Sequence, residues 1–312
     1  MTNLILDLDT GIDDAIALFL SAVHPEVNLL GVIGTYGNVT LSQGVSNSLD
    51  ILHAAGRDDV PVYPGKENAL SESVEHVPSF ISRRIHGENG TGNVTFPHSA
   101  RKAENENGIG WLIRMMKEYD GDLVYVATGP LTNLAFALLL EPSLSSGRVR
   151  VVSMGGALTV RGNVSPVAEA NIHKDPEAAR TVYESGLDVT MVGLDVTMRS
   201  RLRRSDAESW ISTGKEAGKL LGSMLLYYIE NTTGSDDTYV HDPSAVICAL
   251  HPEYFTLLRT PLTVETEGEE RGRVHVPASR ILERDASTEA AVDVRSTLVE
   301  AELGRILSFL KY

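Results

Sequence analysis

The sequence predicts an α/β protein in which helices flank a mostly parallel central sheet. Three observations support this prediction. Strand-like and helix-like segments alternate over most of the 312 residues, which is the rhythm of βαβ units. The composition, 42% hydrophobic and 22% charged, is that of an ordinary globular protein. No internal repeat or low-complexity stretch breaks the pattern, so we expect residues 1–312 to form a single domain.

The individual elements follow from local patterns. An apolar run at residues 4–8 is typical of a buried strand, and apolar side chains at helical spacing predict a helix over residues 12–23. Further strands are predicted at residues 27–34, 123–127, 149–154 and 189–194, and further helices at residues 41–55 and 131–140. Asp175 followed by Pro176 predicts another helix start, because Asp caps helices and Pro favours the first helical position.

Three other regions depart from this alternation. Residues 68–107 are irregular and residues 199–240 are expected to be largely helical. Segments of this length between the elements of a compact protein usually carry function or form lids. Residues 256–294 are expected to be a β-rich C-terminal extension, and a helix closes the chain.

Charge and cysteine content narrow the possible partners. The formal net charge is −15, which argues against nucleic acid or an anionic membrane surface as a main partner, since phosphate binding needs clustered Lys and Arg. The single cysteine, Cys248, excludes an internal disulfide and fits a reducing compartment. We find no signal-peptide pattern and no apolar run of the ~18–20 residues that a membrane helix needs. We therefore expect a cytoplasmic protein.

Four aspartates, Asp7, Asp9, Asp13 and Asp14, lie where the first predicted strand ends and the first helix begins. In open α/β sheets, ligands bind at this rim. Crowded carboxylates repel one another unless a positive charge lies among them, so a hard divalent cation with oxygen ligands is the natural candidate. A structural alternative stays open for Asp13 and Asp14, because acidic residues suit the first turn of a helix. That alternative explains Asp9 less well and Asp7 poorly.

Polar side chains also follow the other predicted strands. They are Asn38 after the second strand, Thr128 and Asn133 after the third, and Asn163, Glu169 and Asn171 after the strand that ends at Met154. Asn is a common turn former and helix cap, and we interpret Asn133 in that way. The repetition of such groups at one rim instead indicates a polyhydroxylated ligand such as a sugar.

Two histidine segments complete the candidate site. Asp242 followed by Pro243 is a good helix start, which is the structural alternative for that segment. The functional interpretation makes Asp242 a metal ligand and His241 a general acid, because histidine titrates near neutrality and can protonate a leaving group. His86 lies in a glycine-rich stretch at residues 85–92, which is interpreted as a functional loop or, alternatively, as ordinary surface.

These motifs are similar to those of one enzyme family. The stretch Asp7-Leu8-Asp9-Thr10-Gly11-Ile12-Asp13-Asp14-Ala15 closely resembles the N-terminal signature of the inosine–uridine-preferring nucleoside hydrolases. The resemblance continues along almost the whole chain, through Gly37-Asn38, His86-Gly87, Thr128-Gly129-Pro130, Met154-Gly155-Gly156, the Asn163, Glu169 and Asn171 set, Val192 to Thr197, and His241-Asp242-Pro243.

The resemblance implies a fold, an activity and a set of roles. The family has a Rossmann-like sheet with Ca²⁺ at the bottom of its pocket, and it hydrolyses ribonucleosides to ribose and a free base. By motif match, Asp9, Asp14, Asp242 and the main-chain carbonyl of Thr128 would hold the metal. Asp9 would also take the proton from the attacking water, and His241 would protonate the departing base, with His86 nearby. The ribose would contact Asp13, Asn38, Asn163, Glu169, Asn171, Asp242 and the backbone at Met154. A small-molecule ribonucleoside is the implied partner, and the family alone suggests a dimer or tetramer.

These roles agree with the chemistry of the reaction. Cleavage of the glycosidic bond builds oxocarbenium character on the sugar, which a carboxylate-rich site stabilises. Ca²⁺ takes roughly six to eight oxygen ligands, which leaves room for water and sugar hydroxyls. The presence of a histidine at position 241 resembles the less selective or pyrimidine-preferring branch of the family. Purine-specific members lack a histidine at the matching place and use aromatic stacking. Part of the stretch 225–228 is expected in the base pocket, and Trp111 and Trp210 are expected in the core.

Two rival functions remain open. A phosphatase of the haloacid dehalogenase type also begins with Asp-x-Asp after a strand, but its pattern places Thr or Val where Gly11 stands. A non-catalytic nucleoside or ribose sensor would keep the pocket, yet it needs neither Asp9 nor His241. Incubation with uridine and inosine separates the three. A phosphatase releases nothing from an unphosphorylated nucleoside, and a sensor binds without turnover.

Overall fold

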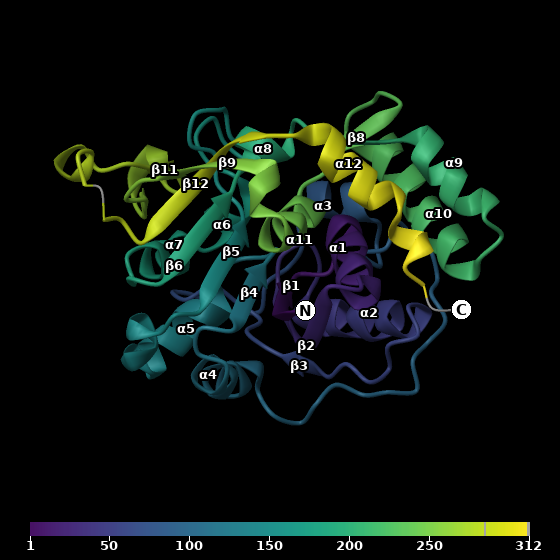
Figure 1. Cartoon of the computed structure of the whole chain (residues 1–312), viewed down its shortest axis with the longest axis horizontal. Coiled ribbons are helices and arrows are strands. Elements are labelled where there is room, and N and C mark those ends of the chain that lie inside the picture. Colours follow the sequence, from purple (N-terminus) through teal and green to yellow (C-terminus); the bar gives the residue numbers. More distant parts are fainter. Residues whose placement is uncertain (284, 311–312) are drawn as a thin grey trace.

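Eight strands form the central sheet of the computed structural model, which describes residues 1–283 and 285–310 (Figure 1). In spatial order they are β3 (Val62–Pro64), β2 (Val27–Gly34), β1 (Thr2–Leu8), β4 (Leu123–Ala127), β5 (Arg150–Met154), β6 (Asp188–Val192), β12 (Thr288–Val294) and β9 (Phe255–Arg259). All neighbours in this sheet pair parallel except β12 and β9, which pair antiparallel. The predicted mostly parallel α/β fold is therefore confirmed.

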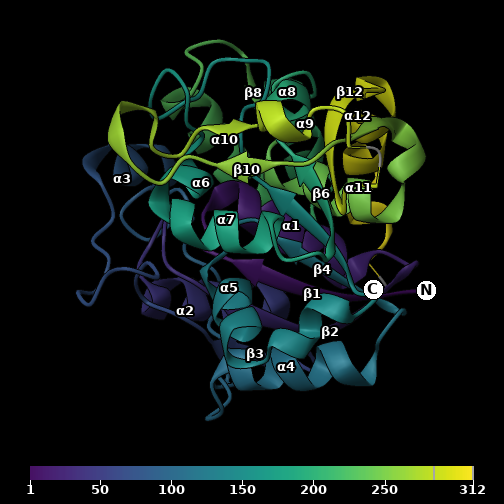
Figure 2. The same ribbon diagram turned by 90° about the vertical axis from the view of Figure 1, so that its left-hand side faces the viewer.

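Helices cover both faces of the sheet (Figure 2). Leu4, Leu6 and Leu8 of β1 share one core with α1, α2 and α11, and Ile5 shares the opposite core with α4, α5 and α7. The bounds of these helices are α1 (Ile12–Val23), α2 (Leu41–Ala54), α4 (Gly108–Glu118), α5 (Thr132–Leu140), α7 (Pro176–Tyr183) and α11 (Asp242–Leu250). Strand β1 is thus buried on both faces, which is why its sequence is almost continuously apolar.

The remaining helices are α3 (Phe80–His86), α6 (Ala170–Lys174), α8 (Leu194–Thr197), α9 (Arg204–Ser212), α10 (Glu216–Asn231) and α12 (Ser296–Gly304). Residues 199–240 are largely helical, as predicted, because they contain α9 and α10. Trp111 and Trp210 are both buried, as expected. None of the helices in the described part of the chain is both long and apolar enough to cross a membrane.

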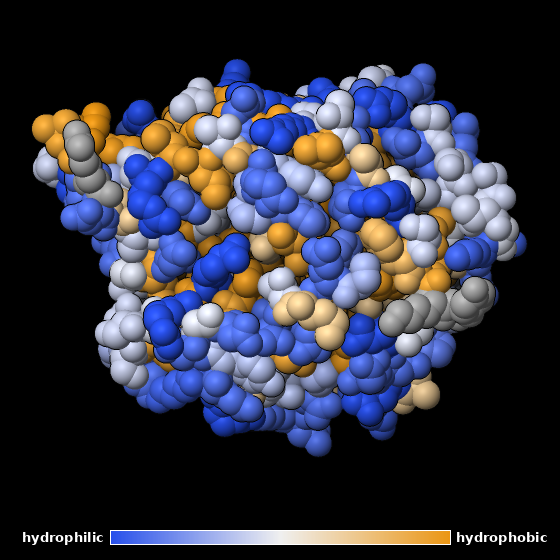
Figure 3. Space-filling view, in the orientation of Figure 1, coloured by the Kyte–Doolittle hydropathy of each residue, from blue (hydrophilic) through white to orange (hydrophobic). Residues whose placement is uncertain are grey.

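The β-rich C-terminal region extends the central sheet. Strand β12 pairs with β6, and β9 forms the edge beyond it. Two short antiparallel pairs lie outside the sheet, β10 (Thr263–Val264) with β11 (Val274–His275), and β7 (Arg201–Arg203) with β8 (Asp237–Tyr239). Apolar side chains gather at the end of the molecule that carries β11 (Figure 3), and Ile281 and Leu282, which follow β11, are exposed.

Several elements have no counterpart among the predicted ones, including helix α3 within the segment predicted to be irregular, strand β3 and helix α4. Strand β3 is only three residues long, which is too short for a periodic pattern. Helix α4 follows the irregular segment at 68–107, and the side chain of Asn107 caps it by accepting a hydrogen bond from the N–H of Ile109. An Asn cap of this kind is a helix-start signal, but here it lies in a stretch rich in other turn-forming residues.

The strand order reverses between β1 and β4, and we refer to the switch point at their carboxyl ends as the crevice. The chain runs from β1 outward to β2 and β3, and then returns to place β4 on the other side of β1. In the register of this pair, Asp7 lies opposite Ala127, so the segments that follow, with Asp9 and Thr128, leave the sheet side by side. Ligands of open α/β sheets bind at such a switch point.

Asp7 supports this crevice from behind. It is fully buried, it accepts hydrogen bonds from the hydroxyl of Tyr125 and from Nδ2 of Asn133, and burial raises its pKa to about 7. The carbonyl oxygen of the Asn133 side chain in turn accepts the N–H of Lys66. Asn133 is therefore a buried link between elements, and its interpretation as a simple turn former or cap was wrong.

Replacement of Asp7 by Ala is expected to lower the free energy of unfolding by about 2–4 kcal/mol, because two buried donors lose their acceptor. Chemical denaturation followed by circular dichroism measures the change. Asp236→Ala, which removes an exposed carboxylate paired with Arg204, is the matched control and should change stability by less than about 0.5 kcal/mol. Equal stabilities of the two variants would contradict the role assigned to Asp7.

Candidate active site

The carboxylate of Asp9 lies at the centre of the crevice. It is fully buried just beyond β1. Its Oδ2 accepts hydrogen bonds from the backbone N–H of Asn38 at 2.7 Å and from Nζ of Lys174 at 3.0 Å, and its Oδ1 accepts Nδ2 of Asn38 at 3.2 Å. Asn38 follows β2, so residues from three separate segments meet at this one carboxylate.

Asp13 and Asp14 lie in the first turn of α1 and are also buried. Asp14 accepts the backbone N–H of Gly11 at 2.9 Å, which is the helix-capping contact that the structural alternative foresaw. It also accepts Nδ2 of Asn38 and the hydroxyl of Thr128, at 3.2 and 2.6 Å. Asp14 therefore links α1 to the end of β4, which capping alone does not require.

Thr128, Met154 and Asn171 meet on the β4–β5 side of the crevice. Nδ2 of Asn171 donates to the main-chain oxygens of Thr128 at 2.7 Å and of Met154 at 3.2 Å. Asn171 lies directly after Glu169, whose buried carboxylate accepts the backbone N–H groups of Gly156, Asn171 and Ile172. Four of the predicted residues are thus joined in one hydrogen-bonded group.

Asn163 differs from the other predicted ribose contacts. Its side chain is exposed, and its Oδ1 accepts the backbone N–H of Ala170 at 2.9 Å. This bond ties the loop before α6 to the residue next to Glu169. Asn163 is therefore joined to the residue that follows Glu169, but its side chain is not buried with the hydrogen-bonded group of Thr128, Met154, Glu169 and Asn171.

His86, the last residue of α3, is buried against α1. Its Nδ1 accepts the backbone N–H of Ile12 at 3.1 Å and lies 3.9 Å from Oδ1 of Asp13. Because Nδ1 is an acceptor, the proton of the neutral ring is on Nε2. The ring of Tyr228 in α10 lies 5.7 Å from that of His86, and its hydroxyl donates to Oδ2 of Asp13 at 3.1 Å. The expected contribution of the 225–228 stretch therefore comes at least from Tyr228.

His241 caps α11 and precedes Asp242. Its Nδ1 lies 2.9 Å from the hydroxyl of the buried Thr197, at the end of α8. A hydroxyl can donate to a bare nitrogen or accept from a protonated one, so Thr197 holds the ring in either state. Burial lowers the pKa of both His241 and His86, which keeps the two rings uncharged near neutral pH.

The charge of the crevice is strongly unbalanced. Burial, followed by the charges of Asp9 and Asp13, raises the pKa of Asp14 well above its usual value. Burial, followed by the charge of Asp13, does the same for Asp242. The ionised forms of these carboxylates thus need a positive charge that the surrounding side chains do not fully supply.

The donor set fits a hard metal ion. Asp13, Asp14 and Asp242 each place one carboxylate oxygen so that all three lie within 4.8 Å of one another. Oδ1 of Asp13 is buried and has no hydrogen-bond partner among the described residues, so it is free to act as an acceptor or a metal ligand. All these ligand atoms are oxygens, which suits Ca²⁺ or Mg²⁺ better than a soft metal. Asp9, which is also expected in the ligand set, lies outside this trio and pairs with Lys174.

Lys174 is a residue of this site that the sequence did not indicate. It ends α6 and directly precedes the Asp175-Pro176 helix start, where a lysine usually reaches into solvent. Here its side chain is only 15% exposed. Burial acts to lower its pKa, but the charge of Asp9 and the hydrogen bond to it raise the pKa above the ordinary value. Lys174 therefore stays charged inside the crevice.

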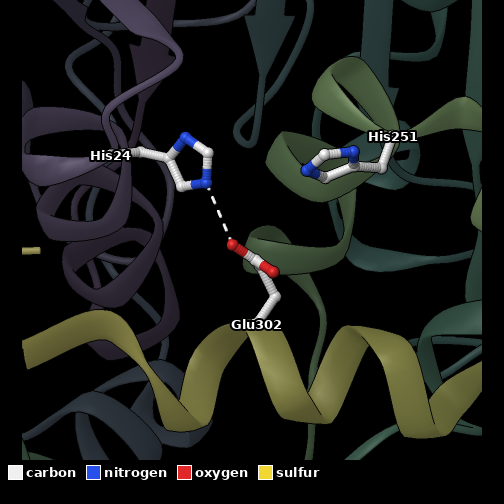
Figure 4. Close-up of side chains that lie close together, drawn as sticks. All are labelled: His24, His251 and Glu302. Carbon is white, nitrogen blue, oxygen red and sulfur yellow. Dashed lines mark hydrogen bonds and ion pairs between the residues drawn. The ribbon is translucent and has the colours of Figure 1, made fainter. Parts of the chain in front are cut away.

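A second group of potential ligands lies near the amino ends of β1 and β2, at the other end of these strands from Asp9. His24 at the end of α1, His251 after α11 and Glu302 in α12 point toward one another (Figure 4). Nδ1 of His24 accepts the backbone N–H of Glu26, so Nε2 carries the proton that it donates to Glu302 at 3.0 Å. A protonated nitrogen has no lone pair for a metal. This cluster therefore serves as a hydrogen-bonded clamp between α1 and α12.

Proteins named as nucleoside-cleaving enzymes resemble this chain. Uridine nucleosidase 1 of Arabidopsis thaliana is 36% identical over 269 residues, which are 85% of this chain and 79% of the relative. The pyrimidine-specific ribonucleoside hydrolase RihA of Enterobacter sp. (strain 638) is 33% identical over 312 residues, 98% of each protein. The structure of a purine-preferring ribonucleoside hydrolase from Gardnerella vaginalis has a TM-score of 0.96 and 40% identity, with 99% of each chain covered.

The fold and the site together define an α/β protein with a buried cluster of acidic side chains at the switch point of a Rossmann-like sheet. A family model described as inosine-uridine preferring nucleoside hydrolase matches residues 4–301. The chain belongs to this family and is a nucleoside hydrolase, which confirms the resemblance stated from the sequence.

Replacement of Gly37 by Ala is expected to lower nucleoside hydrolysis by about 10²-fold, since small displacements of catalytic groups cost about that much. A Cβ at Gly37 would lie 2.9 Å from Cγ of Asp9 and 2.8 Å from Nζ of Lys174, so the ion pair must move. Steady-state kinetics measure the loss. Gly304→Ala, whose Cβ meets nothing within 4 Å, is the control, and a similar loss in both variants would contradict this explanation.

Proposed function

We propose that this protein is a calcium-dependent ribonucleoside hydrolase that cleaves the N-glycosidic bond to give ribose and a free base. The observation that carries the proposal is the buried group of carboxylates at the carboxyl ends of β1 and β4, with Asp13 Oδ1 unpartnered inside it. A pocket of this kind can hold a cation and a polyhydroxylated sugar together. The relatives' names, which include uridine nucleosidase and ribonucleoside hydrolase, support the same substrate class.

The proposed ligands of Ca²⁺ are the carboxylates of Asp9, Asp14 and Asp242 and the main-chain oxygen of Thr128. Asp14 accepts a hydrogen bond from the Thr128 hydroxyl at 2.6 Å. One of its carboxylate oxygens lies within 4.8 Å of a carboxylate oxygen of Asp242. Bound Ca²⁺ would lower the pKa of a water molecule and help to orient sugar hydroxyls. Ca²⁺ is favoured over Mg²⁺ because a set of four protein oxygens suits its higher coordination number, whereas Mg²⁺ usually keeps several waters.

Asp9 is the proposed general base. It takes the proton from the attacking water, and the remaining carboxylates stabilise the positive charge that develops on the sugar. His241 is the proposed general acid. Its contact with Thr197 at Nδ1 leaves Nε2 as the nitrogen that donates a proton to the departing base. The lowered pKa of His241 makes its protonated form a stronger acid, although that form is the minor one near neutral pH.

The ribose is proposed to contact Asp13, Asn38, Met154, Asn163, Glu169, Asn171 and Asp242. Oδ1 of Asp13, which lacks a partner among the described residues, is free to accept a hydrogen bond from a sugar hydroxyl. The hydrogen bonds of Glu169 with three backbone N–H groups hold its carboxylate in one orientation. Asn163, which is exposed, would have to leave Ala170 in order to bind.

Base preference, location and assembly belong to the same proposal. Relatives named for uridine, pyrimidine and purine substrates all resemble the chain, so we propose that it accepts both base classes. His86 and Tyr228 lie together beside Asp13, and we propose that they form part of the base pocket. Cys248 is a free, buried thiol, which suits the cytoplasm. A homo-oligomer is proposed from the family, and light scattering tests it.

The proposed function is tested by incubating the protein with uridine and inosine and measuring reducing sugar. Hydrolysis is expected for at least one of them. Chelation should abolish it, and added Ca²⁺ should restore it. A protein that binds both nucleosides but releases no ribose would be a sensor, and activity that survives complete metal removal would exclude the metal role.

Asp9→Ala should lower hydrolysis by about 10²- to 10⁴-fold, which is the usual contribution of a general base. Binding of the nucleoside, measured by calorimetry in the presence of Ca²⁺, should change much less. If the variant retains the wild-type turnover number, Asp9 is not the base.

Deoxyuridine should be hydrolysed on the order of 10²-fold less efficiently than uridine, because the missing hydroxyl leaves buried polar groups without a partner. The ratio of kcat/KM values for the two substrates gives the discrimination. Comparable values would contradict the proposed contacts with the ribose hydroxyls.

A further inference from the structure

The Lys174–Asp9 ion pair has no role in the mechanism proposed above. Nζ of Lys174 lies 3.0 Å from Oδ2 of Asp9 and 3.5 Å from Oδ1 of Asn38. The Asp9 side chain is fully buried and the Lys174 side chain is 15% exposed. Burial of an ammonium group costs free energy unless the charge is paired, so the position of Lys174 needs a physical reason.

The carboxylates around it provide that reason. Asp9, Asp13, Asp14, Asp242 and Glu169 are all buried. Glu169 is compensated by backbone N–H groups. Among the described lysines and arginines, Lys174 alone places a nitrogen within 4.0 Å of any of these five carboxylates. It therefore supplies the one fixed positive charge inside the acidic pocket.

The same carboxylate is a proposed metal ligand. Oδ2 of Asp9 already accepts hydrogen bonds from Lys174 and from the backbone of Asn38, whereas Oδ1 accepts one from the Asn38 side chain. A cation held by Asp9 must share this carboxylate with the ammonium group. Repulsion between the two positive charges would weaken the binding of the metal.

We propose that Lys174 is a built-in counter-cation that stabilises the acidic pocket before metal binds and lowers the pocket's affinity for the metal. The inference rests on the proposed metal site, and it adds a residue that sets the affinity of that site for the metal. If Lys174 were only a structural support for Asp9, its loss would weaken the protein and the metal site together. A counter-cation has the opposite signature, with a less stable metal-free protein and tighter metal binding.

The test uses the full-length protein after chelation, with Lys174→Met, which keeps the length of the side chain but removes its charge. Calorimetric titration with Ca²⁺ is expected to give an affinity about tenfold higher than wild type. The thermal midpoint of the metal-free variant should fall, and saturating Ca²⁺ should restore it. Lys174→Arg should stay near wild type in both measurements, and so should Lys219→Met, which removes an exposed lysine.

Equal or weaker Ca²⁺ binding by Lys174→Met would overturn the inference, as would an unchanged midpoint without metal. If the variant does not fold without metal, it should fold when Ca²⁺ is added first, and failure to do so also overturns the inference. Uridine hydrolysis by the wild type is measured in parallel. The wild type could hydrolyse uridine and bind Ca²⁺ while Lys174→Met binds Ca²⁺ no more tightly than the wild type. That result would refute the role of Lys174 but would leave the proposed function standing.

Discussion

The concentration of buried negative charge at the crevice between β1 and β4 is the constraint on which the rest of the site depends. Asp9, Asp14 and Asp242 are almost completely removed from water, and burial raises the pKa of the latter two. Ionised carboxylates at such a place are stable only beside positive charge or hydrogen-bond donors. In this structure, Asp9 accepts hydrogen bonds from the ammonium group of Lys174 and the side-chain amide of Asn38, and Asp14 accepts one from the hydroxyl of Thr128.

The parallel sheet makes this concentration possible. Its parallel strands all end on one side of the sheet, so the segments that follow them deliver their polar groups to the same place. Strand β1 also separates two functions by its alternation. Leu4, Leu6 and Leu8 face one core, while Asp7 faces the other and binds Tyr125 and Asn133. Beyond the last strand residue the alternation ends, and Asp9 enters the crevice instead of a core.

Several site residues were predictable because their signals are local. Asp9, Asp13, Asp14 and Asp242 stand next to strand ends or helix starts, and the family resemblance pointed to Asn38, Glu169 and Asn171. Lys174 had no comparable signal, and although Thr197 and Tyr228 lay in stretches that the sequence had singled out, their partners were not predictable. Each acts through a partner far along the chain, as Tyr228 does through Asp13 and Thr197 through His241. Nothing in the residues beside them distinguishes such side chains from ordinary loop or helix positions.

The sequence by itself determined the strand–helix alternation, the nature of the pocket and the enzyme family, because hydrophobic periodicity and motif spacing are properties of contiguous residues. Only the tertiary structure decided how the charges are balanced. It gave Asn133 a buried structural role, left Asn163 exposed, and set the ammonium of Lys174 against Asp9. These outcomes depend on distances between residues that are separated in the chain, and such distances exist only after the sheet has brought its strand ends together.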